Sequence, residues 1–343
     1  MIDIAKGVIA GGWALLVGWL LPTAINVTIF CVFVLPSLQN KQFNSKSIKG
    51  AVPDTWILIG VTILAGLILN AIQRQLYGIL EGYTLWPQWA SKWGHDKQEG
   101  RRRKLQTRLE KIQDKLAKEK IAWRKVNTTL DRMSAYPDDP KQIAPTRLGN
   151  AIRQFEGYAY DRFQLDSQTL WYELSATAPA EVTRQADVAR GPVDLFVCLI
   201  YGHIMVALAA IGAIFAGCPE GWILGIVSAA LVVLSRFWYV IAYTAAGEWA
   251  ATQQALANLG RKPLADALGL KLPDNLDDER TMWRRVTYFV QNPYEQDVEY
   301  FDAFRPAGDD NPEEGSVIES AGKISKRRLR QWLAMRLGGE ADK

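Results

Sequence analysis

The sequence predicts an all-α, polytopic membrane protein with four spans and helical cytoplasmic segments, one of which is like a coiled coil. Three observations lead to this class. Apolar residues make up 49% of the 343 residues and are concentrated in three long blocks, which suit a bilayer better than a globular core. The remaining chain is dense in charge. Several of the thirteen Trp lie at the block edges, where their amphipathic rings favour the headgroup level.

The first block, residues 7–38, contains no charged residue in 32 positions. A span needs about 20 residues, so one long tilted helix fits, and a tight hairpin around Pro22 is the alternative. A cleaved signal peptide is disfavoured, because the apolar stretch is about twice the length of a signal core and no cleavage site of small residues follows it.

Two further blocks supply the remaining spans. The second begins after Pro53 and is apolar to about Ala71, and its helical pattern extends to Tyr83. The third, residues 193–249, is interrupted by turn-forming residues at 217–221. Each half of the third block is long enough to cross a bilayer, so we expect an antiparallel hairpin there.

Lys and Arg near the span ends predict the orientation. With one span in the first block, the basic middle segment and the tail share the side of the N-terminus, which places both termini in the cytoplasm and the chain in a bacterial inner membrane. Lys41, Lys46 and Lys49 in the following loop count against this orientation, and a hairpin at Pro22 would export the middle segment. The predicted organisation is spans one and two in residues 1–83, a cytoplasmic helical domain in 84–192, a transmembrane hairpin in 193–249 and a cytoplasmic tail in 250–343.

Ionisable residues at membrane depth are functional candidates. Arg236 lies 15 residues past Gly221, or roughly 22 Å along a helix, and Arg74 lies similarly in the second span. Both arginines could snorkel to the headgroups or take a pore-lining or pairing role. Asp194 and Glu81 enter from the same side and are their natural partners.

His203 lies inside the third span, about nine residues or roughly 14 Å from its start. One interpretation is a neutral imidazole that bonds to a carbonyl of a neighbouring helix, and the other is a proton relay or gating residue. Asn26, Asn70 and Ser235 could add hydrogen bonds between spans. This mixture suits packed spans and an oligomer.

Residues 101–133 carry a heptad pattern for about four heptads, with charges on the other faces. It predicts a coiled coil, or one helix of a long hairpin, and a coiled coil would favour a homo-oligomer. The alternative is an amphipathic helix that packs on its own chain, which suits the large Trp123 better. The seam positions are Leu105, Leu109, Ile112, Leu116, Trp123, Val126, Leu130 and Met133.

A Pro-Thr-Arg-Leu-Gly-Asn run at residues 145–150 is followed by interleaved Arg, Glu and Tyr. Acids match the basic residues here, so we expect a structural cap against the membrane face rather than a nucleic-acid site. This run and Glu81-Gly82-Tyr83 together resemble a group of uncharacterised bacterial multi-span membrane proteins. Those proteins pair Glu-Gly-Tyr after a span with a later Pro-Thr-Arg-Leu-Gly-Asn run. The resemblance covers a minor part of the chain and implies a membrane location, but no activity and no site residues.

The tail ends in a basic amphipathic stretch from Lys323 to Leu337, which suits anionic lipid of the inner leaflet. The alternative is a solvated helix that packs on the acid-rich residues 274–319.

Signatures of enzymes and cofactors are missing from the sequence. It has no phosphate-binding loop, no dinucleotide fingerprint and no nucleophile elbow, and neither its two His nor its three Cys have metal-ligand spacing. We therefore expect no cofactor, no metal and no enzymatic activity. The intramembrane polar residues and the heptad seam favour a homo-oligomeric channel or membrane effector controlled from the cytoplasm, as in stress or phage defence. The alternatives are a membrane-anchored scaffold or sensor that positions a cytoplasmic protein partner, and an enzyme acting at the membrane.

Overall fold

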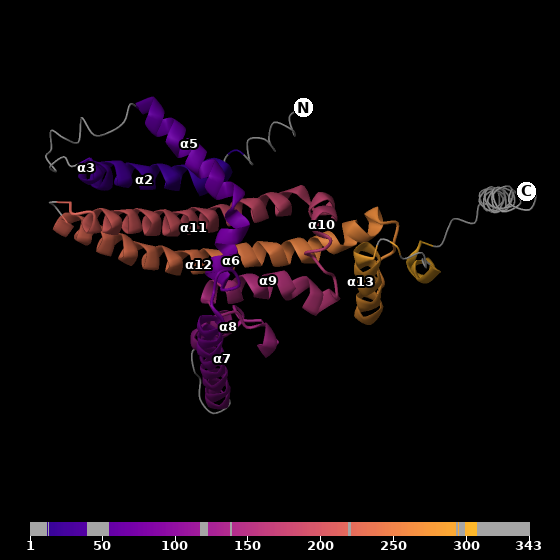
Figure 1. Cartoon of the computed structure of the whole chain (residues 1–343). Coiled ribbons are helices and arrows are strands. Elements are labelled where there is room, and N and C mark those ends of the chain that lie inside the picture. Colours follow the sequence, from indigo (N-terminus) through magenta and orange to yellow (C-terminus); the bar gives the residue numbers. More distant parts are fainter. Residues whose placement is uncertain are drawn as a thin grey trace, which may run out of the picture.

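In the computed structural model every regular element of the described part of the chain is a helix (Figure 1), which confirms the predicted all-α class. Three of its helices are long and apolar enough to cross a membrane, and a fourth candidate is a bent pair of helices. The membrane class of the prediction thus agrees with the structure, and the count of four spans stays a prediction. The described residues are 12, 14–39, 55–116, 123–137, 139–218, 221–292, 294 and 299–306.

The first apolar block forms one continuous helix over Leu16–Leu38 rather than a hairpin at Pro22. Proline lacks an N–H and its ring clashes with the carbonyl four residues earlier. A wider π-helical turn precedes each proline of this helix, Pro22 and Pro36, and removes that conflict without ending the helix. The segments are η1 (Leu16–Leu20), α2 (Leu21–Ile29), η2 (Phe30–Val34) and α3 (Leu35–Leu38).

The second apolar block is α5 (Thr55–Ala71), which is followed by α6 (Gln73–Glu81) after a bend of 59°. Most large apolar side chains of α5, such as Trp56 and Leu64, are exposed. A surface of this kind along a whole helix is unusual for a soluble protein and is expected where lipid is the solvent.

The third block forms α11 (Ala180–Phe215) and α12 (Gly221–Ala267), which pack against each other as the predicted hairpin (Figure 1). At 1.5 Å per residue they are about 54 and 70 Å long, well beyond the roughly 30 Å of a hydrocarbon core. Both helices therefore continue past the apolar bundle into the remainder of the protein.

The helix Leu16–Leu38 runs parallel to α11. Thr23 lies beside Cys198, with 3.5 Å between Oγ1 and Sγ, and the Cys218 thiol donates to the carbonyl of Ser37 at 3.1 Å. The residue numbers of the contacting pairs increase in the same direction along both segments, which is why the two helices are parallel. The start of the first helix, the start of α11 and the end of α12 thus lie at one end of the bundle.

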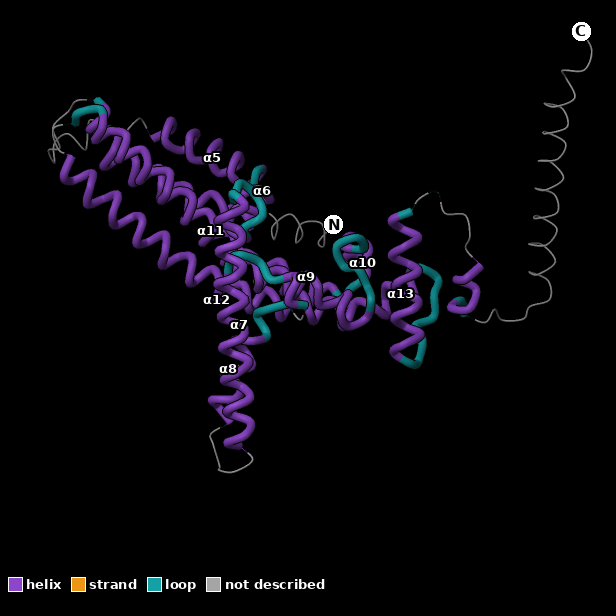
Figure 2. Tube along the Cα trace, turned by 60° about the horizontal axis from the view of Figure 1, so that its bottom comes forward, coloured by secondary structure: helices purple, strands orange, loops and turns teal. Residues whose placement is uncertain are grey.

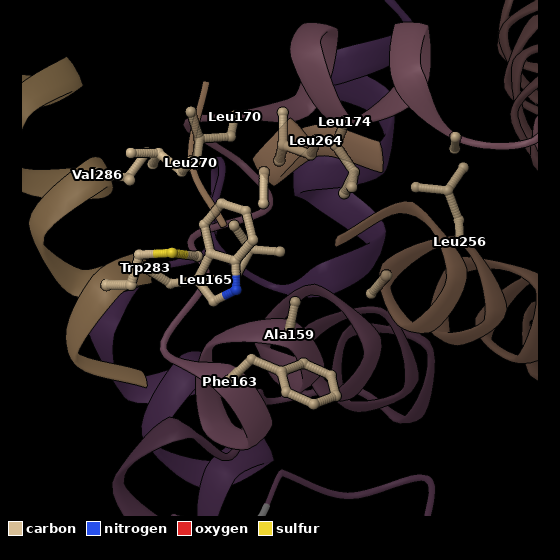
Figure 3. Packing of buried hydrophobic residues seen from close by; sticks show 14 of the residues in the cluster. Ala159, Phe163, Leu165, Leu170, Leu174, Leu256, Leu264, Leu270, Trp283 and Val286 are labelled. Carbon is tan, nitrogen blue, oxygen red and sulfur yellow. The ribbon is translucent and has the colours of Figure 1, made fainter. Parts of the chain in front are cut away.

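That end carries a helical body of α9 (Arg147–Phe163), α10 (Trp171–Thr177), α13 (Leu276–Gln291) and the extensions of α11 and α12. Its core centres on Trp283, which is fully buried among Leu165, Leu174 and Leu264 (Figure 3). Burying one such side chain contributes roughly 1.5–3 kcal/mol. Because Leu264 belongs to α12, the core of this body includes the extension of a candidate span.

The predicted heptad helix is divided between α7 (Gln88–Leu116) and α8 (Trp123–Met133), which pack on each other as a hairpin. The prediction of one continuous helix over 101–133, alone or as one arm of a longer hairpin, is therefore corrected: the heptad segment supplies parts of both arms of the hairpin. Leu105, Leu109 and Ile112 are half-buried and Val126 is buried within the chain, so one chain already satisfies most of the seam, although Leu130 stays exposed. The hairpin runs across the direction of α11 and α12 (Figures 1 and 2).

Several predictions fall outside the described residues. These are the loop with Lys41, Lys46 and Lys49, the side chains of Leu116 and Trp123, and the basic stretch Lys323 to Leu337.

Candidate functional site

His203 is buried where three helices of the bundle meet. Its Nδ1 lies 2.7 Å from Oδ1 of Asn26 on α2, and Trp238 of α12 donates its indole N–H to Nε2 at 3.2 Å. An indole nitrogen is only a donor, so Nε2 must accept and Nδ1 must carry the proton that goes to Asn26. The imidazole is therefore neutral, and both of its nitrogens are occupied by protein groups.

Gly202 makes this arrangement possible. A Cβ at Gly202 would overlap the amide group of Asn26, so the asparagine can reach His203 only because the neighbouring residue has no side chain. Asn26 also donates to the carbonyl of Pro22 at 2.8 Å. Small residues that admit polar side chains between helices are a common means of packing spans.

Asp194 is buried on the same helix as His203, closer to the helical body. Tyr77 of α6 donates its hydroxyl to Oδ1 at 2.7 Å, and Arg190 places Nε 3.4 Å from Oδ2. Arg190 also donates to Gln73 at 3.1 Å. The charge of Asp194 is thus matched by a cation one helical turn away, rather than by Arg74 or Arg236 as predicted.

Arg74 and Arg236 are both exposed. The guanidinium of Arg236 lies 5.6 Å from the ring centre of Tyr239, and its neighbours on α12 include the exposed Val233 and Phe237. The structure does not bring either arginine to Asp194 or to Glu81 within ion-pair distance in the described part of the chain. Their outward direction fits snorkelling or contact with another molecule.

Glu81 and Gly82 lie against the Pro-Thr-Arg-Leu-Gly-Asn run, 65 residues away in the chain. Gly82 has φ +96°, and a Cβ on it would come within 2.9 Å of the Pro145 ring. A Cβ on Gly149 would lie 2.6 Å from the carbonyl oxygen of Glu81, and the Thr146 hydroxyl donates to that oxygen at 3.3 Å. The two motifs of the family resemblance therefore form one contact, which joins the end of α6 to the start of α9.

Most residues of the 145–150 run have a structural task in this contact. Thr146 caps α9 by accepting from the Gly149 N–H at 2.9 Å, and Asn150 bonds both backbone groups of Ala144. The Leu148 N–H donates to the Tyr239 hydroxyl at 3.3 Å, which ties α9 to α12. Arg147 is exposed, whereas the five other residues of the run are buried.

Charged groups extend this contact along α9. Arg153 lies 4.8 Å from the ring centre of Tyr83. Burial raises the pKa of the Glu156 carboxyl above its ordinary value, although Arg153 and a hydrogen bond from Gln168 oppose the shift. Glu81 and Glu156 interact electrostatically, so the motif contact holds two acids around one arginine.

Over the described residues, the fold and this site define a helical protein whose apolar helices are compatible with a membrane and whose polar groups join those helices to a helical body. Comparisons with protein-family models, curated proteins and solved structures give no match. Within the described residues, no group of three or more His, Cys, Asp or Glu could hold a metal ion.

Sequence reasoning missed Tyr77, Trp238 and Arg190. The four-residue spacing of Arg190 and Asp194 on one helix is a signal that could have identified that pair. Tyr77 and Trp238 had no local signal, because their partners are distant in the sequence.

Proposed function

We propose that the chain is a membrane-anchored scaffold or sensor that positions a cytoplasmic partner on the body formed by α9, α10 and α13. The observation that carries this proposal is the continuity of α12, a helix of 47 residues whose apolar half lies in the bundle and whose other half lies in the core of the body. A continuous helix transmits a tilt or shift of the bundle directly to the body.

The polar interior of the bundle supports a packing role over a conducting one. Both ring nitrogens of His203 are used within the protein, and Asp194 has Tyr77 and Arg190 as partners. Groups that bond to each other between helices hold spans together, whereas a water-filled path needs polar groups that face open space.

A cytoplasmic location of the body follows from the positive-inside rule. Residues 88–133 hold fourteen Lys and Arg against six Asp and Glu, and they leave the bundle at the end that carries the body (Figure 2). This excess outweighs the three lysines of the loop after the first span, so the inner membrane with both termini in the cytoplasm remains our assignment.

Photocrosslinking in cells tests the scaffold proposal. A photoreactive amino acid replaces Tyr172, which is exposed on the body, or Phe215, which is exposed at the opposite end of α11. We expect a discrete adduct with one protein from position 172, lost in a Trp283→Ala variant that loosens the body, and no such adduct from position 215. The absence of any protein adduct from position 172, in cells where the protein is folded and inserted in the membrane, would contradict the proposal.

A homo-oligomeric channel or effector is the second candidate, and Arg236 favours it. An exposed arginine among apolar side chains at membrane depth is costly unless it snorkels or meets another chain. Purified protein in liposomes should then pass ions, and Arg236→Ala should change the conductance, whereas Lys262→Ala, which removes an exposed charge from the body, should not. A monomer in detergent that gives no flux at any voltage or pH would remove this candidate.

A further inference from the structure

The α7–α8 hairpin concentrates positive charge on one projecting element. Its residues 88–133 carry a net charge of +8, with fourteen basic against six acidic residues, whereas the whole chain carries +4. The rest of the chain is therefore net acidic. The concentration of positive charge on this one hairpin therefore needs an explanation of its own.

The base of the hairpin lies at the level where the spans reach the membrane surface. Tyr239 is 18 residues past the start of α12, or roughly 27 Å along the helix, close to the roughly 30 Å thickness of a hydrocarbon core. Tyr239 accepts from Leu148, and Gln98 of α7 donates to the neighbouring Pro145 carbonyl at 3.5 Å. Gln98 also accepts from Tyr136 at 3.2 Å, so α7 is anchored at the headgroup level.

From this base the hairpin runs across the direction of the spans (Figures 1 and 2). If α11 and α12 follow the membrane normal, then α7 follows the membrane surface. Its 29 residues extend about 44 Å. One flank of α7 is therefore turned toward the lipid along much of this length.

One flank of α7 has the composition that a membrane surface requires. Seven residues follow each other at spacings of four and three, which place them on one side of a helix. Trp89 and Trp93 are 74% and 61% exposed, and the Lys97 ammonium lies 4.3 Å from the ring centre of Trp93. We call this set the aromatic–basic flank, and its members are Trp89, Trp93, Lys97, Gly100, Lys104, Arg108 and Lys111.

The opposite flank of α7 differs in charge. On the other side of the seam that faces α8, it carries Glu99, Gln106 and Glu110 together with Lys92 and Arg103, and Arg103 pairs with Glu99 at 2.6 Å. The aromatic–basic flank thus holds four cations and no acid, whereas acids accompany the cations of the opposite flank. An excess of cations on one side suits a hairpin that rests on an anionic surface. Exposed Trp followed by Lys and Arg is also the composition of interfacial helices.

We propose that the aromatic–basic flank of α7 lies on the bilayer that the chain itself spans and binds the headgroups of anionic lipids. Trp89 and Trp93 enter the headgroup layer beside the end of α6, and Lys104, Arg108 and Lys111 contact lipid phosphates farther out. The surface is hollowed between these three side chains and Arg103 and Thr107, which gives a phosphate room to approach. This proposal requires that the chain spans a membrane and is independent of the scaffold function.

Fluorescence quenching in nanodiscs tests it with the full chain. A probe is attached through Gly100→Cys on the aromatic–basic flank, where a Cβ meets no other atom, or through Gln106→Cys on the opposite flank. Cys218→Ser removes the half-buried native thiol, since Cys31 and Cys198 are buried. Lipids with a spin label on the headgroup are the quencher, in discs with or without phosphatidylglycerol.

We expect quenching several-fold stronger at position 100 than at position 106 in anionic discs. High salt or Lys104→Gln with Arg108→Gln should lower it toward the level in neutral discs. The matched control, Lys262→Gln with Lys271→Gln, removes two exposed charges from the body and should leave the quenching unchanged. Equal quenching at both positions, or no dependence on anionic lipid, would overturn the proposal. Tight binding of an oligonucleotide to the same flank, with no lipid effect, would also overturn it.

Discussion

Asn26 and His203 lie 177 residues apart in the chain and 2.7 Å apart in the structure, where their side chains join the first helix to α11. The contact depends on Gly202, because any side chain there would occupy the place of the Asn26 amide. The buried polar pair thus depends on a neighbouring glycine. Mutation can separate the contribution of the Asn26–His203 hydrogen bond from that of the close approach at Gly202.

Gly202→Ala should destabilise the bundle, by about 1–3 kcal/mol if the added methyl forces the helices to shift. Thermal or denaturant unfolding in detergent measures the change. Gly212→Ala on the same helix is the matched control, since its Cβ would meet no atom within 4 Å. In a double-mutant cycle, Asn26→Ala should recover part of the loss in Gly202→Ala. Additive effects of Gly202→Ala and Asn26→Ala would show that the two residues are not in contact.

Gly149→Ala should loosen the contact between α9 and the end of α6. The added Cβ would lie 2.6 Å from the Glu81 carbonyl oxygen, and backbone cannot yield as a flexible side chain can. We expect a loss of about 1–3 kcal/mol, measured by unfolding, and faster proteolysis between α6 and α9. Gly157→Ala on the same helix, where the nearest atom is 3.4 Å away, should have little effect. A Gly149→Ala protein as stable as Gly157→Ala would contradict the close approach.

Much of the fold followed from the sequence, because length and lack of charge are local properties. The break at residues 217–221 predicted the hairpin of α11 and α12, and the uncharged block before Leu38 fitted one long helix, although it left a hairpin at Pro22 open. The heptad pattern predicted helices, but a pattern of spacing does not specify whether its partner is another chain or its own continuation. Val126 is buried within its own chain.

The site was predicted less well than the fold. His203, Asp194 and Asn26 were identified because polar residues are rare in apolar segments. That Asn26 pairs with His203, and that Trp238 and Tyr77 are partners, depends on tertiary packing that no local pattern reports. The two motifs of the family resemblance gave no hint that they touch. Only the glycines of the two motifs, Gly82 and Gly149, indicate a close approach. A glycine in the sequence does not say which segment approaches it, so the contact could be recognised only in the structure.

The buried Glu279 and the half-buried Arg261 form an ion pair that holds α13 to α12. Nη1 of Arg261 donates to both oxygens of the Glu279 carboxylate, which also accepts from the Trp283 indole at 3.1 Å, while Nε of Arg261 donates to the Asn258 carbonyl at 3.3 Å. Glu279→Ala removes the acceptor of Arg261 Nη1 and of the buried Trp283 indole, so we expect a loss of about 1–3 kcal/mol and release of α13, seen as faster amide exchange over residues 276–291. Asp277→Ala on the same helix, whose carboxylate is exposed, should leave α13 protected. Equal protection in both variants would contradict the role of the pair.

Glu156 should make the stability of the body depend on pH. Burial raises the pKa of its carboxyl in the folded protein, so the ionised form costs stability, and this cost is present above the folded pKa. As the pH falls through that pKa the carboxyl takes up a proton and the cost disappears. Glu156→Gln removes the ionisation and keeps a group that can bond to Gln168. The variant should therefore be more stable than the native protein at neutral pH, and the difference should shrink toward zero below about pH 4, under the ordinary pKa of Glu.

The melting temperatures of the two proteins, compared from pH 8 to pH 4 in the same detergent, measure this difference. Glu173→Gln, an exposed neighbour on α10, controls for the change of net charge. A gap that stayed constant with pH, or that widened in acid, would rule out burial as the dominant influence on Glu156.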